Sequence, residues 1–553
     1  MKKIATWAAC ALMATAPAAA QNKGSHNFEV SRNLEIFNDI YKELEMFYVD
    51  TLSADTVMRA GIDAMLGEID PFTQYYPADD NDEIREMTTG TYAGIGAVIR
   101  YMEKESRVAI IEPLEDSPAS EAGLKAGDVI LSIDGADMKG KSSAEVSRLL
   151  RGEAGTTFVL AVKRYGRADS LEFKITRRNI STPAVPYYGM AGEGVGYILF
   201  DRFVEGSWQE LRRAVTDLKS QGAEALVLDL RGNPGGSLAE AVEVTNLFVP
   251  KREKVVYTRG KLASVNSEHY TSREPLDADI RLAVLTDGST ASAAEIVAGA
   301  LQDMDRAVVV GQRTYGKGLV QMVRPVSYDG TLKITTSRYY IPSGRCIQAY
   351  DYRHLNADGS ARTLPDSLTH VFYTAGGREV RDGGGIKPDV EIAPDSLPTV
   401  VYDLSASDVV LEFENKYVFE HDSIAPAGEF ALTDEDYEAF VEMVAASDFT
   451  YMRRTENTFN LLKLAAQIEG CYEDAKGEFD ALEAKLNADV RADLARPKSK
   501  QSIIDFLEYD LAGRYYFQRG ALKQQQKNDK ELKAALEVLG DRERYEGILH
   551  PAK

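Results

Sequence analysis

Apolar residues recur at helical spacing towards both ends of the chain. In residues 28–87 they stand three or four positions apart, as in Leu34, Phe37 and Tyr41, which predicts two or three helices. The same spacing returns beyond Pro394 and predicts a helical carboxyl-terminal region of roughly 150 residues.

The segment 90–178 has a different pattern, in which short runs of β-branched and apolar residues alternate with glycine. Such runs predict β-strands. They lie at 94–99, 108–111, 128–133 and 157–162. One helix is predicted at Ser143–Leu150, where a serine caps the first turn and Glu145 follows within it.

Between residue 194 and about residue 391, strand-like and helix-like runs alternate along the chain. The predicted strands are 195–200, 225–230, 282–285 and 307–310, and the predicted helices are 208–220, 238–247 and 292–304. This alternation predicts a layered α/β domain.

A chain of 553 residues is long enough for several domains. We therefore predict a multidomain α/β (α+β) protein. Its expected parts are N-terminal helices at 28–89, a strand-rich module at 90–178, a layered α/β core at 179–393 and a helical C-terminal domain at 394–553.

Residues 1–20 have the order of a cleaved secretory signal peptide. Lys2 and Lys3 precede an apolar run at 4–15, and small residues follow it. This run is shorter than the roughly 20 residues that a spanning helix needs. We expect export to the periplasm, with outer-membrane association or secretion as open alternatives. Lipid anchoring at Cys10 is less favoured, because the cysteine comes too soon after Lys3.

Cysteine content and charge narrow the class of protein. Only Cys346 and Cys471 follow the predicted signal peptide, so we expect no disulfide framework. The formal net charge of −22 at pH 7 argues against nucleic acid or anionic lipid as a partner. Later apolar runs are too short to span a bilayer, so we expect a soluble protein with peripheral membrane contact at most.

Ser292 is the first chemical candidate, because it follows the strand at 282–285 and opens the helix at 292–304. A serine on such a turn has an exposed hydroxyl, and the N–H of Ala293 could hold a developing oxyanion. Helix-capping serines are nevertheless much commoner than nucleophiles. The turn alone leaves both interpretations open.

A serine nucleophile needs a base, and none of the six histidines lies at a glycine-flanked strand end. Lysine can replace histidine when burial favours its neutral amine. Lys317, which lies between Gly316 and Gly318, fits this role. Gln321 shares its strand face, because residues four apart on a strand point the same way. Its amide could orient the lysine, although a structural role explains this glutamine almost as well.

The segment from Gly311 to Lys317 also imitates a phosphate-binding loop. The match fails at Gly318, where that motif requires serine or threonine. It fails again at 319–325, which has a strand-like and not a helix-like pattern. We therefore do not expect nucleotide binding.

A glycine-rich turn follows the strand predicted at 225–230. The backbone N–H of Gly235 or Gly236 could supply a second oxyanion donor. A tight turn that requires positive φ explains these glycines equally well.

These segments resemble the carboxyl-terminal processing, or tail-specific, serine peptidases. The matching blocks are 229–236, 289–296, Gln302-Asp303 and 311–321. In that family the nucleophilic serine and the general-base lysine are 25 residues apart, as Ser292 and Lys317 are here. The resemblance implies catalytic roles for Ser292, Lys317 and Gln321, an oxyanion hole of Ala293, Gly235 and Gly236, and a structural role for Asp303.

The family also carries a PDZ domain before its catalytic core, and 90–178 resembles such a β-barrel-like module. Backbone amides of one PDZ loop capture the terminal carboxylate of a peptide. The resemblance assigns this loop to Gly94, Ile95, Gly96 and Ala97, and a relay to the active site to Arg151. The similarity says little about the insertion at 350–379 or about 394–553.

The resemblance implies an exported serine endopeptidase that binds protein tails and cuts them near the carboxyl terminus by Ser-Lys(-Gln) acyl transfer. We expect no cofactor and no metal, because no His-Glu-x-x-His or comparable cluster occurs. The expected partners are proteins or peptides with accessible C-terminal tails, and homo-oligomerisation through the helical termini stays open. The alternative is a catalytically silent PDZ scaffold that binds tails without cutting them.

Overall fold

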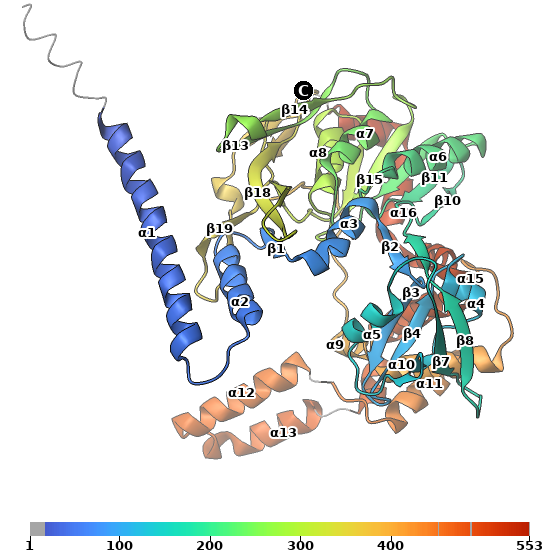
Figure 1. Cartoon of the computed structure of the whole chain (residues 1–553). Coiled ribbons are helices and arrows are strands. Elements are labelled where there is room, and N and C mark those ends of the chain that lie inside the picture. The colour runs from blue at the N-terminus through green and yellow to red at the C-terminus, as the bar shows by residue number, and fades with distance from the viewer. Residues whose placement is uncertain (1–16, 452, 487–488, 552–553) are drawn as a thin grey trace, which may run out of the picture. The chain divides into compact units, whose positions relative to one another are not determined.

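The computed structural model describes residues 17–451, 453–486 and 489–551 (Figure 1). Residues 1–16 of the predicted signal peptide lie outside this part of the chain. The described residues divide into two compact units, of which the first comprises residues 17–75 together with 332–334. The second unit comprises the remainder.

The first unit contains two helices, α1 (Pro17–Phe47) and α2 (Ala54–Gly67). The Ser53 hydroxyl accepts a hydrogen bond from the N–H of Thr56 and so satisfies one of the free donors at the start of α2. With α3 (Asn81–Thr89) of the second unit, these helices confirm the prediction for 28–87. None of the described helices combines the length and hydropathy needed to cross a bilayer.

The strand-rich module contains one main antiparallel sheet in the order β3-β4-β5-β7-β8, with β6 beside β5, while β2 pairs with β9. The strands are β2 (Thr91–Gly94), β3 (Ala97–Met102), β4 (Arg107–Pro113), β5 (Val129–Ile133), β6 (Ala136–Asp137), β7 (Thr157–Lys163), β8 (Leu171–Thr176) and β9 (Arg178–Ser181). The helices are α4 (Pro118–Ala122) and α5 (Ser143–Leu150). Helix α5 has the predicted bounds, and Ser142 and Glu145 cap it reciprocally.

The strand predicted at 94–99 is wrong in one respect, because it is two strands with a break between them. Strand β2 ends at Gly94 and β3 begins at Ala97. Gly96 has a φ of +72°, which turns the chain out of the extended conformation. The break therefore lies in the loop that the resemblance assigns to peptide binding.

The layered core is built on a six-stranded sheet in the order β10-β11-β12-β15-β16-β23. The strands are β10 (Tyr187–Gly192), β11 (Val195–Leu199), β12 (Ala225–Asp229), β15 (Arg281–Thr286), β16 (Val308–Gly311) and β23 (Val390–Glu391). Neighbours from β11 onward are parallel, and β10 is antiparallel to β11. This sheet confirms the four strands predicted between 195 and 310.

Helices cover both faces of this sheet, as parallel sheets require. The helices α6 (Ser207–Ser220), α7 (Leu238–Asn246) and α8 (Ala293–Asp303) share one apolar core with it. On the other face, the strands pack with the last two helices, α16 (Lys530–Gly540) and α17 (Arg542–Leu549). Figure 1 shows the red ribbon of α16 beside the green strands. The end of the chain thus completes the core.

Seven other helices lie in the described part of the C-terminal region, and most of them share a core of their own. They are α9 (Thr399–Ser405), α10 (Asp408–Glu420), α11 (Asp434–Ala446), α12 (Arg454–Glu469), α13 (Lys476–Leu486), α14 (Val490–Leu494) and α15 (Pro497–Gln525). Phe413, Phe440 and Leu507 are buried members of the cluster that α9, α10, α11, α14 and α15 share. The helical pattern predicted beyond Pro394 is confirmed.

A second sheet has the order β18-β13-β14, with β17 paired to β18. Its strands are β13 (Lys254–Gly260), β14 (Ser267–Tyr270), β17 (Leu319–Pro325) and β18 (Thr331–Tyr340), and the short β1 is Gln74–Tyr76. The insertion at 350–379 lies in two small hairpins. These are β19 (Tyr350–Leu355) with β20 (Ala361–Thr363), and β21 (Val371–Tyr373) with β22 (Glu379–Arg381). Cys346 and Cys471 are free thiols.

Candidate active site

Ser292 lies on the turn between β15 and α8, as the sequence predicts. Its φ is +56° and its ψ is −115°, a conformation that residues other than glycine rarely adopt. Such strain costs on the order of 1–3 kcal/mol and is concentrated at functional sites. The next residue, Ala293, is buried in the first turn of α8.

Glu295 joins Ser292 to Lys317 through their backbones. This carboxylate is fully buried. Its Oε2 atom accepts the N–H of Ser292 at 2.9 Å and that of Lys317 at 2.8 Å. Its Oε1 atom accepts the N–H of Gly316 at 2.7 Å and the hydroxyl of Thr314 at 2.5 Å. Burial raises the pKa of Glu295 to about 7, although the four donors favour its ionised form.

Tyr339 makes a second contact with both residues. Its hydroxyl donates to the carbonyl of Lys317 at 2.6 Å and lies 3.1 Å from the carbonyl of Ser292. The side chain is 1% exposed, and this burial raises its pKa well above the usual range, so that the phenol keeps its proton. One carboxylate and one phenol therefore hold together two residues that are 25 positions apart in the sequence.

The glycines that flank Lys317 let the chain pass close to its neighbours. A Cβ atom on Gly316 would lie 2.4 Å from the Cβ of Ala349, and one on Gly318 would lie 2.8 Å from the N atom of Gln348. The N–H of Gly318 donates to the Gln348 side chain at 2.7 Å. The following strand β17 confirms that no helix follows the lysine, so a phosphate-binding loop is excluded.

Gln321 lies on β17, the strand that begins two residues after Lys317. Its amide nitrogen donates to the hydroxyl of Thr335 at 3.0 Å. The amide oxygen is the atom of Gln321 that could accept a hydrogen bond from the lysine amine. Its role as the lysine-orienting group stays a prediction.

The Gly235–Gly236 turn lies directly against Ser292. A Cβ atom on Gly235 would lie 2.8 Å from both the Ser292 Cβ and the Ala293 N, and one on Gly236 would lie 2.2 Å from the carbonyl oxygen of Phe203. Both glycines have positive φ, +96° and +140°. Only glycine fits these positions, because of conformation and of space.

Asn233 decides which N–H groups of this turn remain available. Its side-chain oxygen accepts the N–H of Gly235 at 2.8 Å, and its side-chain nitrogen donates to the carbonyl of Phe200 at 2.6 Å. Within the described residues, no hydrogen bond is donated by the N–H of Gly236 or by that of Ala293. Of the two glycines, Gly236 is therefore the better candidate donor.

The predicted peptide-binding loop lies between β2 and β3, and β3 is an edge strand of its sheet. The Ile95 carbonyl accepts the N–H of Ala119, and the Gly96 carbonyl accepts the hydroxyl of Ser117 at 2.9 Å. These bonds fix the loop through its carbonyls. The edge strand provides the geometry that strand addition by a peptide requires.

Arg151 ends α5 close to this loop. Its guanidinium pairs with Glu86 of α3 at 2.6 Å and lies 4.5 Å from the centroid of the Tyr92 ring. Its side chain would also contact a Cβ atom on Gly94, at 3.7 Å. Its relay function stays a prediction.

Three residues of the candidate site were not predicted from the sequence. Glu295, Tyr339 and Asn233 received no role. Glu295 has a detectable signal, because a serine followed three residues later by glutamate at a helix start is a capping-box pattern. Tyr339 and Asn233 act through contacts with distant segments, which no local pattern reveals.

Asp303 lies apart from this chemistry. It accepts from Arg345 at 2.8 Å, and both side chains are almost completely buried. It also accepts the N–H of Ser343 at 3.0 Å. These contacts suit the structural role expected for it. No group of three His, Cys, Asp or Glu side chains suited to a metal ion occurs in the described part of the chain.

Three family models match the chain. Residues 110–164 match the PDZ domain, residues 194–354 match peptidase family S41, and residues 400–539 match the C-terminal helical domain of probable PDZ-proteases. The S41 match includes Ser292, Lys317 and the Gly235–Gly236 turn.

Known proteins resemble the chain over much of its length. A carboxy-terminal-processing protease of Bartonella bacilliformis is 36% identical over 321 residues, which is 57% of this chain and 73% of that protein. A probable CtpA-like serine protease of Staphylococcus haemolyticus is 34% identical over 56% of this chain and 61% of that protein. The solved photosystem II D1 C-terminal processing protease is 26% identical over 68% of this chain and 96% of that chain, with a TM-score of 0.35. The chain therefore belongs to the carboxy-terminal-processing serine protease family, peptidase family S41, with a PDZ domain and a C-terminal helical domain.

Proposed function

We propose that this chain is an exported serine endopeptidase that captures protein tails on its PDZ domain and cuts them with Ser292 and Lys317. The observation that carries the proposal is the double link between these two residues. Glu295 accepts both of their N–H groups, and Tyr339 contacts both of their carbonyls. A peptide-binding scaffold without catalysis would not need these links.

In the proposed reaction, the neutral amine of Lys317 takes the proton of the Ser292 hydroxyl as the oxygen attacks a peptide carbonyl. A tetrahedral intermediate forms, and its oxyanion accepts hydrogen bonds from the N–H groups of Ala293 and Gly236. The Lys317 ammonium then gives its proton to the leaving amine, and the peptide bond breaks. Water, deprotonated by the same lysine, attacks the ester carbonyl; the bond to the Ser292 oxygen breaks, the lysine returns the proton to this oxygen, and the new carboxyl end of the substrate leaves.

Tail selection is proposed to take place on the PDZ domain. A substrate tail would add a strand to β3, and the amides of the loop from Gly94 to Ala97 would bind its carboxylate. Supporting features are the edge position of β3 and the fixed carbonyls of the loop. The expected occupant is an unstructured C-terminal tail.

The catalytic pair is tested with Ser292→Ala and Lys317→Ala in the full chain. Each variant should lose at least about 1000-fold in kcat/KM on a protein with an unstructured tail, because residues of one catalytic unit act together. Melting temperatures and circular dichroism should stay near those of the parent. Ser289→Ala and Lys261→Ala, both exposed, serve as matched controls and should cleave normally. Full activity of either catalytic variant would contradict the mechanism.

The catalytically silent scaffold is the competing function. It would bind the tail peptide as the enzyme does but would show no turnover and no labelling by a serine-reactive phosphonate. Labelling that disappears in Ser292→Ala would exclude it. The PDZ step is tested by comparing cleavage rates on substrates with different tail sequences. We expect the rates to depend on the tail in the parent, and this dependence should be lost after substitution in the loop from Gly94 to Ala97.

A further inference from the structure

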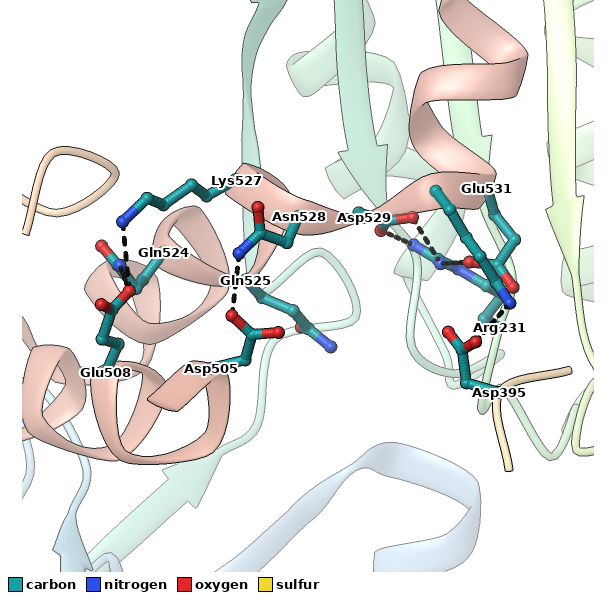
Figure 2. Close-up of a pocket in the computed structure, with 11 residues that line it drawn as sticks. Arg231, Asp395, Asp505, Glu508, Gln524, Gln525, Lys527, Asn528, Asp529 and Glu531 are labelled. Atoms are coloured by element: carbon teal, nitrogen blue, oxygen red, sulfur yellow. Dashed lines mark hydrogen bonds and ion pairs between the residues drawn. The ribbon is translucent and has the colours of Figure 1, made fainter. Parts of the chain in front are cut away.

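Two acidic residues begin α16, the helix that covers one face of the core sheet. Asp529 is the N-cap, and its carboxylate accepts the N–H of Leu532 at 2.8 Å. Glu531 follows in the first turn. Their side chains are only 6% and 12% exposed. Figure 2 shows both pointing towards Arg231, beside a cavity of about 220 Å³.

Arg231 links this helix to the core sheet. Its guanidinium donates to Asp529 at 3.1 and 2.6 Å and lies 3.5 Å from Glu531. It also pairs with Asp229, the last residue of β12, at 2.5 Å. Although burial lowers the pKa of Arg231, Asp229 and Asp529 raise it overall. The cation therefore stays charged and bridges two segments almost 300 residues apart.

Arg231 is also the second residue after β12, at the start of the turn that carries Gly235 and Gly236. The rest of the turn is fixed to other segments. The N–H of Gly232 donates to Asp287 at 3.1 Å, and the Asn233 carbonyl accepts the N–H of Ala291 at 2.9 Å. Among the described residues, the start of the turn is connected to α16 by the hydrogen bonds from Arg231 to Asp529.

We propose that Asp529, assisted by Glu531, is a positioning residue for the oxyanion turn and acts through Arg231. This inference rests on the proposed function. A displacement of about 1 Å in catalytic geometry can cost 100-fold in rate, and a single oxyanion donor contributes about 100- to 1000-fold to kcat. In this proposal, α16 helps to hold the oxyanion turn in place through Arg231.

The variant Asp529→Asn in the full chain separates pairing from capping. Asparagine caps a helix as well as aspartate does, but it removes the charge that holds Arg231. We expect kcat on an unstructured-tail substrate to fall about 10- to 100-fold, with KM within twofold of the parent. Binding of a peptide aldehyde, which forms an oxyanion at Ser292, should weaken by a similar factor.

Three further variants complete the experiment. Binding of the tail peptide to the double variant Ser292→Ala, Asp529→Asn should equal its binding to Ser292→Ala. Asp505→Asn, which lines the same cavity but bonds Asn528 instead of Arg231, should leave kcat unchanged. Glu531→Gln should lower kcat about 3-fold without raising KM, and it provides the test should Asp529→Asn fail to fold.

The outcomes of this experiment are distinct. If the parent cleaves and both Asp529→Asn and Glu531→Gln keep its kcat and aldehyde affinity, the positioning role is wrong while the proposed peptidase stands. If KM rises in step with the loss of kcat/KM, the helix acts on substrate binding and the inference is also wrong. If the parent itself does not cleave, the proposed function fails.

Discussion

At the scale of single residues, the candidate site depends on Glu295. A fully buried carboxylate is costly unless hydrogen bonds satisfy it. Here four donors do so, and two of them are the N–H groups of Ser292 and Lys317. The bonds that stabilise the buried charge are therefore the bonds that bring the proposed nucleophile and base together.

Glu295→Gln should impair catalysis at pH 8, where the carboxylate of the parent is ionised. Glutamine has one acceptor oxygen, and its NH₂ group would face N–H groups that then have no acceptor. An unsatisfied buried donor costs about 1–3 kcal/mol, so kcat should fall about 10- to 100-fold and the melting temperature should also drop.

Steady-state kinetics and thermal unfolding measure both effects. Glu243→Gln is the matched control, because its carboxylate pairs with Arg273 and is 25% exposed on α7. It should behave as the parent does. Parental kcat in Glu295→Gln would mean that the shared carboxylate has no part in holding Ser292 and Lys317.

At the scale of secondary-structure elements, the prediction was most accurate where local pattern and packing agree. The bounds of α5 and β17 match the predicted ones. Capping residues and turn glycines mark the ends of these elements within a few residues of sequence. The strands β13 and β18 were missed. They form by pairing with each other, and the contacts that make β-strands come largely from the partner strand.

The second face of the core sheet gives a prediction about α16. Leu539 is fully buried there, among residues of the sheet and α17. Leu539→Ala should lower the free energy of unfolding by about 2–5 kcal/mol, as large-to-small changes in cores do. Denaturant-induced unfolding, followed by near-UV circular dichroism, measures this loss of free energy.

Leu461→Ala is the control, because this leucine of α12 is 61% exposed. Its effect should stay within about 0.5 kcal/mol. If the two variants unfold alike, α16 is not an integral layer of the core.

At the scale of the whole molecule, the PDZ domain packs against the C-terminal helices. Leu411 of α10 shares a small apolar cluster with Met102, Ala109 and Val129. The contact is close enough that a Cβ atom on Gly127 would lie 1.9 Å from the Asn415 side chain. Both parts belong to the second unit.

Buried charges lie in this interface. Arg514 pairs with Glu414 at 2.6 Å and donates to Asn415 at 2.8 Å. Asp510, one turn earlier on α15, is a second carboxyl group beside Glu414. Burial and the neighbouring Glu414 raise the pKa of Asp510 well above 3.8.

This shift predicts the sign of a pH effect. The folded protein binds the Asp510 proton more tightly than the unfolded chain does, so stability is lost as pH rises from about 4 towards the raised pKa. Asp510→Asn has no proton to lose. At pH 8 it should be more stable than the parent by at least about 1 kcal/mol, and at pH 4 the difference should vanish.

Melting curves at pH 4, 6 and 8 test this expectation. Glu478→Gln on α13, an exposed position, should follow the parent at every pH. A parent that is no less stable than Asp510→Asn at pH 8 would contradict the assigned direction of the shift.

The sequence by itself determined the element types, the strand-to-helix turn at Ser292 and the spacing to Lys317. Local periodicity, capping and glycine placement encode these features over a few residues. Tertiary structure alone decided that Glu295 and Tyr339 join the two residues, and that Arg231 ties the oxyanion turn to α16. Hydrogen bonds and ion pairs between distant segments depend on how the chain folds back on itself, and the local periodicity of the sequence does not predict them.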